Sequence, residues 1–204
     1  MSRSSIIYPR PLQGGSKIAV AAISAGVPEN LHSRLDDALD YLRSLGFEVV
    51  EGPNTRKLHK LQSTEAEERA RVFMQFWKDD SVDLIMPPWG GNFVMQMLDY
   101  LDFQELMNHR PKWIMGFSDI STFTFPFTLA TGIATAHGDS LMSMIADQSG
   151  ELIHNWPQVL GTTFGEEVVQ NSSAFHTRGS EDWEENFQDS WKLDLPTKWM
   201  TTLG

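Results

Sequence analysis

The stretch Trp113–Ser121, with the sequence WIMGFSDIS, decides how the rest of the chain is interpreted. Its apolar first part, Trp113–Phe117, predicts a short buried strand. Ser118 and Asp119 follow directly, and both residue types are favoured at a helix N-terminus. The next segment, Ile120–Ala130, is rich in apolar and threonine side chains and predicts a helix that enters the core. We therefore expect the serine to lie at a sharp strand-to-helix junction.

A serine at such a junction has two chemical interpretations. Helix N–H groups lie beside it, and they favour a nucleophile and supply donors for an oxyanion. The alternative is that Ser118 only caps the helix. The stretch is not the Gly-x-Ser-x-Gly motif of α/β-hydrolases, because Ile120 stands where the second glycine belongs.

The composition limits the class of protein. A chain of 204 residues, 41% of them hydrophobic, fits one substantial α/β domain, or one domain with an appendage. The formal net charge of −11 argues against a nucleic-acid partner and against an anionic membrane surface. The absence of cysteine excludes thiol catalysis and Cys-ligated metals, and the histidine spacings match no metal pattern. We therefore expect no metal and no cofactor. Because residues 1–9 lack the apolar core of a signal peptide, we expect a cytoplasmic protein.

Apolar runs alternate with amphipathic segments from about residue 16 to residue 144. This alternation predicts an α/β domain with a doubly wound, mostly parallel sheet and helices on both of its faces. A capping box at Thr64–Glu67 is expected to open one of the helices. Strands are expected at residues 16–24, 47–50, 82–86, 113–117 and 133–136. Three loops should then gather at the carboxyl ends of the strands: Pro87–Asn92, Phe117–Asp119 and His137–Ser140.

Two of these loops contain further candidate site residues. The pair Gly90-Gly91 follows a buried strand, so the backbone could approach a ligand closely and present free N–H groups. The pair fits neither a dinucleotide fingerprint nor a P-loop, and the alternative is a tight turn. His137 ends a strand at the same edge, where it is either a hydrogen-bonded structural residue or a base for Ser118.

The last part of the chain differs in composition. Residues 151–204 carry nine acidic and three basic side chains, and four of the seven tryptophans. This segment is too small and too acidic to form its own core. We expect residues 1–148 to form the α/β domain and residues 149–204 to form an acidic, Trp-rich connector.

Five motifs, in order and spacing over about residues 5–145, resemble the LD-carboxypeptidase family of serine peptidases. This family includes the murein tetrapeptide LD-carboxypeptidases and the microcin C self-immunity peptidases. The motifs are residues 87–91 (PPWGG), 98–103 (LDYLDF), 111–113 (PKW), 116–120 (GFSDI) and 131–138 (TGIATAHG).

The resemblance implies a metal-free hydrolase that is usually a homodimer. Ser118 matches the family's nucleophile, and the backbone N–H groups of Gly91 and Asp119 match its oxyanion hole. Family substrates are peptides cut at an L–D bond, or the aminoacyl–nucleotide link of processed microcin. By the same resemblance, the residues expected to contact such a substrate are Trp89, Gly90, Asn92 and His137.

The chain departs from the family pattern in one respect. The Glu and His that complete the family's Ser-Glu-His triad belong to a C-terminal domain that starts about where this sequence ends. A serine without a general base is a weak nucleophile at neutral pH, so we expect a nucleophile-bearing part that is inactive on its own. Two alternatives remain: a non-catalytic α/β binding module whose connector docks a partner, and catalysis within this chain with His137 as the base.

Overall fold

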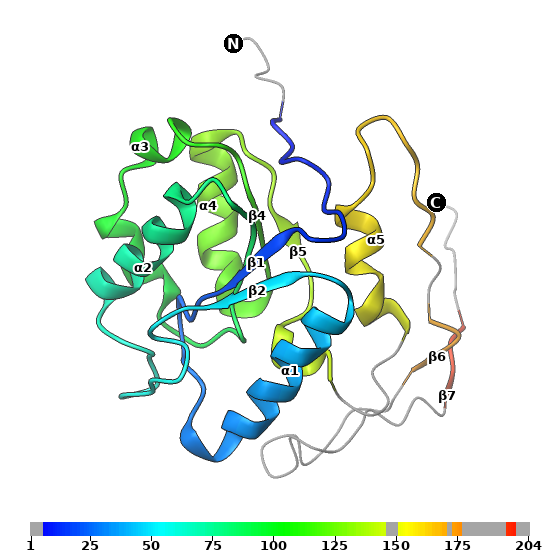
Figure 1. Ribbon diagram of the computed structural model, residues 1–204, viewed down its shortest axis with the longest axis horizontal. Coiled ribbons are helices and arrows are strands. Elements are labelled where there is room, and N and C mark those ends of the chain that lie inside the picture. The colour runs from blue at the N-terminus through cyan, green and yellow to red at the C-terminus, as the bar shows by residue number, and fades with distance from the viewer. Residues whose placement is uncertain (1–5, 146–150, 171–172, 177–194, 199–204) are drawn as a thin grey trace.

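The computed structural model describes residues 6–145, 151–170, 173–176 and 195–198, and Figure 1 draws the others as a thin grey trace. Five parallel strands form one sheet in the order β2-β1-β3-β4-β5. This sheet confirms the predicted doubly wound α/β fold. The strands are β1 (Lys17–Val20), β2 (Glu48–Glu51), β3 (Val82–Met86), β4 (Trp113–Gly116) and β5 (Ala136–His137).

Helices cover both faces of this sheet. Figure 1 shows α2, α3 and α4 on one side and α1 and α5 on the other. The α-helices are α1 (His32–Ser44), α2 (Ala66–Lys78), α3 (Phe103–Met107), α4 (Ser121–Thr131) and α5 (Trp156–Leu160). Short 3₁₀ helices are η1 (Glu29–Leu31), η2 (Val94–Tyr100), η3 (Ser118–Ile120), η4 (Leu141–Ser143) and η5 (Glu151–Asn155). The strands β6 (Phe175–His176) and β7 (Leu195–Pro196) form a separate antiparallel pair.

The strand β5 is shorter than predicted, because its first residues pair elsewhere. Ile133 bridges to Ile7 in the N-terminal segment. The N–H of Ile7 donates to the carbonyl of Gly132, and the N–H of Ala134 donates to the carbonyl of Ile7, both at 2.8 Å. Only Ala136–His137 is left to pair with β4.

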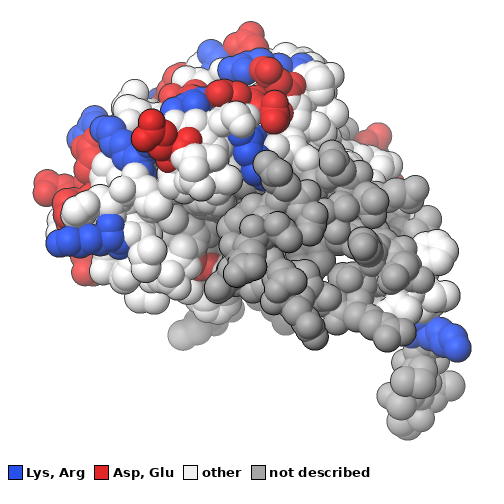
Figure 2. All heavy atoms as spheres, turned by 90° about the horizontal axis from the view of Figure 1, so that it is seen from below, with Lys and Arg blue, Asp and Glu red and all other residues white. Residues whose placement is uncertain are grey.

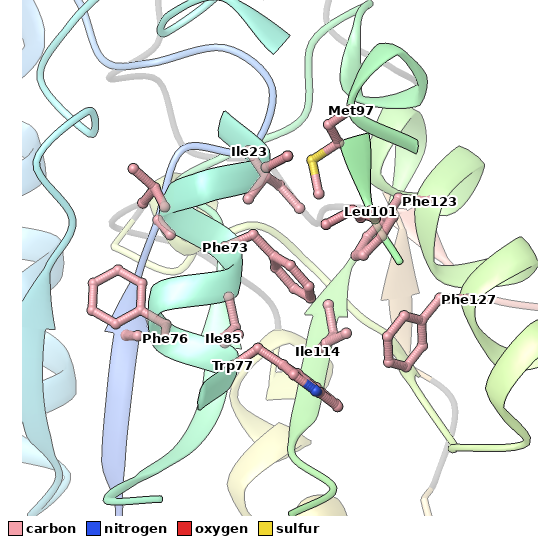
Figure 3. Packing of buried hydrophobic residues seen from close by; sticks show 14 of the residues in the cluster. Ile23, Phe73, Phe76, Trp77, Ile85, Met97, Leu101, Ile114, Phe123 and Phe127 are labelled. Carbon is pink, nitrogen blue, oxygen red and sulfur yellow. The ribbon is translucent and has the colours of Figure 1, made fainter. Parts of the chain in front are cut away.

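Aromatic side chains of α2 and α4 fill the core on one face of the sheet (Figure 3). The ring of Phe73 meets Phe123 edge to face at 5.0 Å, and Trp77 meets Phe127 in the same way at 5.2 Å. All four are fully buried, and each such side chain stabilises the fold by about 1.5–3 kcal/mol. This packing fixes the direction in which α4 leaves β4.

The core on the other face includes α5, which belongs to the predicted connector. Trp156 is 7% exposed and stacks on Phe47 at 5.5 Å, and Leu160 is also buried. The connector was expected to form no core of its own, and α5 packs on the core of the α/β domain. The domain boundary at residue 149 stays a prediction. The other tryptophans of the connector (Trp183, Trp191 and Trp199) lie outside the described residues.

The start of α2 also differs from the prediction. Its N-cap is Glu65, without a side-chain capping bond, so Thr64 lies one residue too early to form a capping box. The hydroxyl of Thr64 is buried and finds no hydrogen-bond partner in the described part of the chain. Asp102 does cap α3, because its side chain accepts hydrogen bonds from the N–H groups of Gln104 and Glu105.

Charged side chains of both signs are intermixed over the described part of the face in Figure 2. Many of them pair locally, as Arg43 does with Asp40 and Arg71 with Glu68. Among the described residues, no helix is both long enough and apolar enough to cross a membrane.

Candidate active site

Ser118 is the first residue of η3, two residues after the end of β4 and directly before the turn into α4. Its φ angle of +56° lies in the left-handed region, which costs a non-glycine residue about 1–2 kcal/mol. The side chain is exposed, and Phe117 before it is fully extended. Gly116 makes the sharp turn feasible, because a Cβ atom there would lie 2.7 Å from the Cγ2 atom of Ile120. The predicted strand-to-helix junction is confirmed, and it stores the kind of backbone strain that gathers at functional sites.

The two glycines of the loop after β3 face different neighbours. A Cβ atom on Gly90 would lie 3.5 Å from both the backbone N of Asp119 and the Cβ of Ser118. On Gly91, whose φ is +157°, it would lie 2.3 Å from the Oγ of Ser24. Gly90 therefore contacts the serine junction, whereas Gly91 lies against the segment that follows β1. The role of Gly91 as an oxyanion donor stays a prediction.

Asp119 ties these segments together through one buried carboxylate oxygen. Its Oδ2 atom accepts hydrogen bonds from the Ser24 hydroxyl at 2.5 Å and from the N–H groups of Phe93 and Val94 at 3.1 Å. The side chain thus caps η2 rather than its own helix, which was not expected from its place beside Ser118. Sequence reasoning missed Ser24 altogether, although it ends the apolar run of the first predicted strand.

The imidazole of His137 lies beside another serine of the same region. Its Nδ1 atom is 3.4 Å from Ser121 Oγ, and its ring meets Phe117 edge to face at 6.5 Å. Among the described side chains, no histidine makes a hydrogen bond to Ser118. Two other imidazoles bond elsewhere: His32 to the carbonyl of Val27, and His154 to the Tyr41 hydroxyl.

The three predicted loops do gather at the carboxyl edge of the sheet. The N–H of Gly138 donates to the carbonyl of Gly116, and the N–H of Met142 donates to the carbonyl of Pro88. The strand order reverses between β1 and β3, so the loops after these strands diverge at a topological switch point, where α/β sheets bind ligands. At this edge Trp89 is half-buried and Asn92 is exposed.

A cavity of about 270 Å³ opens beside His137, between α5 and the ends of β4 and β5. Apolar side chains such as Ile153 and Trp156 line it together with the polar His137 and Asp139. In the part of the chain that the structure describes, no group of three or more His, Cys, Asp or Glu residues is placed to hold a metal ion.

Residues 18–138 match the family model of the LD-carboxypeptidase N-terminal domain. The chain belongs to this family. A Vibrio cholerae protein named as a carboxypeptidase is 30% identical over 197 residues, which are 95% of this chain and 58% of that protein. The microcin C7 self-immunity protein MccF of Escherichia coli is 28% identical over 142 residues, which are 70% of this chain and 41% of MccF. The chain thus spans only about half the length of these relatives.

Solved structures agree with the family fold. The apo structure of MccF superposes with a TM-score of 0.78 at 23% identity and covers 88% of this chain and 54% of its own. An MccF-like protein from Bacillus anthracis gives the same TM-score and identity, with 91% of this chain and 55% of its own covered. At this identity the likeness establishes the fold: the α/β domain described above.

Proposed function

We propose that this chain is the nucleophile-bearing part of a serine carboxypeptidase and that Ser118 is the nucleophile. The observation that carries the proposal is the exposed Ser118 with its left-handed backbone, at the helix start of an LD-carboxypeptidase N-terminal domain. A solved active-site mutant of MccF carries alanine in place of a serine, an asparagine and a lysine, which supports a serine in the chemistry of that protein.

The proposed reaction is acyl transfer through Ser118. Its Oγ attacks the scissile carbonyl carbon and passes its proton to a general base, and the leaving amine takes a proton as the C–N bond breaks. The backbone N–H groups of Asp119 and Gly91 would hold the oxyanion, and Gly90 keeps the approach to them open. Water then hydrolyses the acyl-enzyme. The family's Glu and His would supply the base, because in the described part of the chain no imidazole bonds to Ser118.

The ligands and names of relatives support the substrate class that we propose. Structures of MccF hold adenosine monophosphate, aspartyl sulfamoyl adenosine and glutamyl sulfamoyl guanosine. A Bacillus subtilis relative is named as a murein peptide carboxypeptidase. We propose a peptide with an L–D bond, or a peptidyl-nucleotide conjugate, with Trp89, Asn92 and His137 at its edge. A cytoplasmic homodimer is part of the same proposal.

A chimaera tests this function. The chain would be joined after Gly204 to the C-terminal part of the Vibrio cholerae relative, because the alignment between them covers 95% of this chain. We expect the chimaera to release the terminal D-residue from an L–D tetrapeptide. We expect Ser118→Ala to lower kcat by at least about 10³-fold.

The matched control is Ser121→Ala, which removes a hydroxyl from the same helix start and should keep most of the activity. A chimaera that folds but fails to cleave any peptide cleaved by the intact Vibrio protein would overturn the proposal. Full activity in the Ser118→Ala chimaera would also overturn it.

A further inference from the structure

The backbone of Phe93 is held on both sides by oppositely charged side chains. Its N–H donates to Asp119 Oδ2 at 3.1 Å, and its carbonyl accepts a hydrogen bond from Arg69 Nη2 at 2.9 Å. The same carboxylate oxygen also accepts from the next N–H along the chain and from the hydroxyl of Ser24. Phe93 directly follows the loop Gly90–Asn92, so its position determines where that loop ends.

Arg69 is an unusual residue for this place, because it is fully buried on α2. Its other hydrogen bonds go to neutral acceptors, Gln62 Oε1 at 2.6 Å and Gln96 Oε1 at 3.3 Å. Burial lowers the pKa of Arg69, while the negative charges of Asp119 and then Glu65 raise it. A buried guanidinium needs such a countercharge, and the structure supplies it across the backbone of Phe93.

We propose that Arg69 and Asp119 form a positioning pair, which holds the loop Gly90–Asn92 in a fixed place against Ser118. The proposal rests on the proposed function. In that reaction the N–H groups of the loop would stabilise the negative charge that develops on the substrate, so the loop has to be held in place. Donors fixed in advance need no reorganisation during the reaction. Neither side chain has to touch the substrate. The pair holds the backbone of Phe93, and through it the end of the loop Gly90–Asn92.

Amide hydrogen exchange on the 204-residue chain tests the pair without requiring any activity. The informative variant is Arg69→Met, which removes the charge but leaves the acceptor of the Phe93 N–H in place. We expect the N–H groups of Phe93 and Val94 to exchange at least about tenfold faster, whereas Ile85 in the central strand β3 keeps its rate. The amide chemical shifts of Gly90 and Gly91 should move with them. Arg69→Lys keeps the charge and should restore much of the protection.

Two further variants separate positioning from a general loss of stability. Arg71→Met changes an exposed arginine of the same helix and should leave all these amides unchanged. If Arg69→Met does not fold, Asp119→Asn takes its place, because it keeps the shape while it removes the opposite charge. The proposal is wrong if the Phe93 and Val94 rates do not change, or if Ile85 accelerates equally. An inactive chimaera with the expected exchange pattern would reject only the proposed function.

Discussion

His137 faces Ser121 and not Ser118: its Nδ1 atom lies 3.4 Å from Ser121 Oγ. The chain therefore offers a histidine and a serine that are close together, and separately an exposed serine with a strained backbone. These are competing places for chemistry. The family assignment and the strain both favour Ser118.

Removal of the His137 imidazole should leave the chemical step largely intact. In the chimaera, we expect His137→Ala to change kcat by less than about tenfold, because His137 is not the proposed general base. Loss of a general base would lower kcat on the order of 10²–10⁴-fold. The Michaelis constant is free to change, since His137 lies at the proposed edge of the substrate site. Steady-state kinetics measure both values. A kcat that falls as far as in Ser118→Ala would make His137 the base.

The backbone strain at Ser118 predicts an unusual response to glycine. Glycine adopts a positive φ without cost, so we expect Ser118→Gly to be more stable than Ser118→Ala by about 1 kcal/mol. At Ser121, inside the helix start, the order should reverse, because glycine disfavours a helix by up to about 1 kcal/mol relative to alanine. Urea unfolding of the four variants gives both differences. The same sign at both positions would contradict the left-handed conformation of Ser118.

The two adjacent glycines of the loop should differ in their tolerance of a methyl group. Gly91→Ala would place its Cβ 2.3 Å from Ser24 Oγ, which is held by Asp119, so we expect a loss of about 1–3 kcal/mol in unfolding free energy. Gly90→Ala meets its nearest atoms at 3.5 Å and should cost at most about 0.5 kcal/mol. In the chimaera, the methyl group of Gly90→Ala should still lower turnover, because it would lie beside the backbone N–H of Asp119. Equal stability losses in the two variants would argue against this loop geometry.

A buried lysine should make stability depend on pH. Lys112 is fully buried, donates to the carbonyl of Trp77 and lies 5.4 Å above the centre of its ring. Burial, and then the positive charge of Arg110, lower the pKa of Lys112 from 10.5 to about 8. Between these two pH values the unfolded chain binds more protons than the folded chain, so this group's contribution to stability rises with pH and is lost as the pH falls towards 8.

The comparison variant is Lys112→Met, which cannot titrate. We expect the unfolding free energy of the wild type, minus that of the variant, to increase by about 2–3 kcal/mol across this window. Denaturant titrations at several pH values measure it. Parallel curves for the two proteins would show that Lys112 keeps its charge in the folded state.

The sequence predicted the sheet well, because buried parallel strands are continuous apolar runs with turn residues at their ends. Ile18–Val20 in β1 and Leu84–Met86 in β3 are such runs, and both strands lie inside the sheet as expected. The strand at Ala136–His137 was less predictable, since its neighbour Ile133 pairs with Ile7, more than a hundred residues away in sequence. No local pattern carries that information.

The parts of the candidate site that depend on local sequence were predictable. Ser118 follows an apolar run and precedes a helix, and the Gly90-Gly91 pair marks a loop of close backbone approach. Ser24 donates to Asp119, and Asp119 and Arg69 both bond to the backbone of Phe93. These bonds join segments far apart in sequence, so periodicity could not reveal them. A buried arginine on a helix looks like any other polar residue until the packing around it is known.

The chemical reactivity of Ser118 in the 204-residue chain itself shows whether this serine is the nucleophile. A fluorophosphonate would be incubated with the protein, and the modified residue located by mass spectrometry after digestion. We predict slow labelling that is selective for Ser118, absent in Ser118→Ala and unchanged in Ser121→Ala and His137→Ala. Labelling of Ser121 that depends on His137, or labelling spread over exposed serines without preference for Ser118, would show that Ser118 is not the nucleophile.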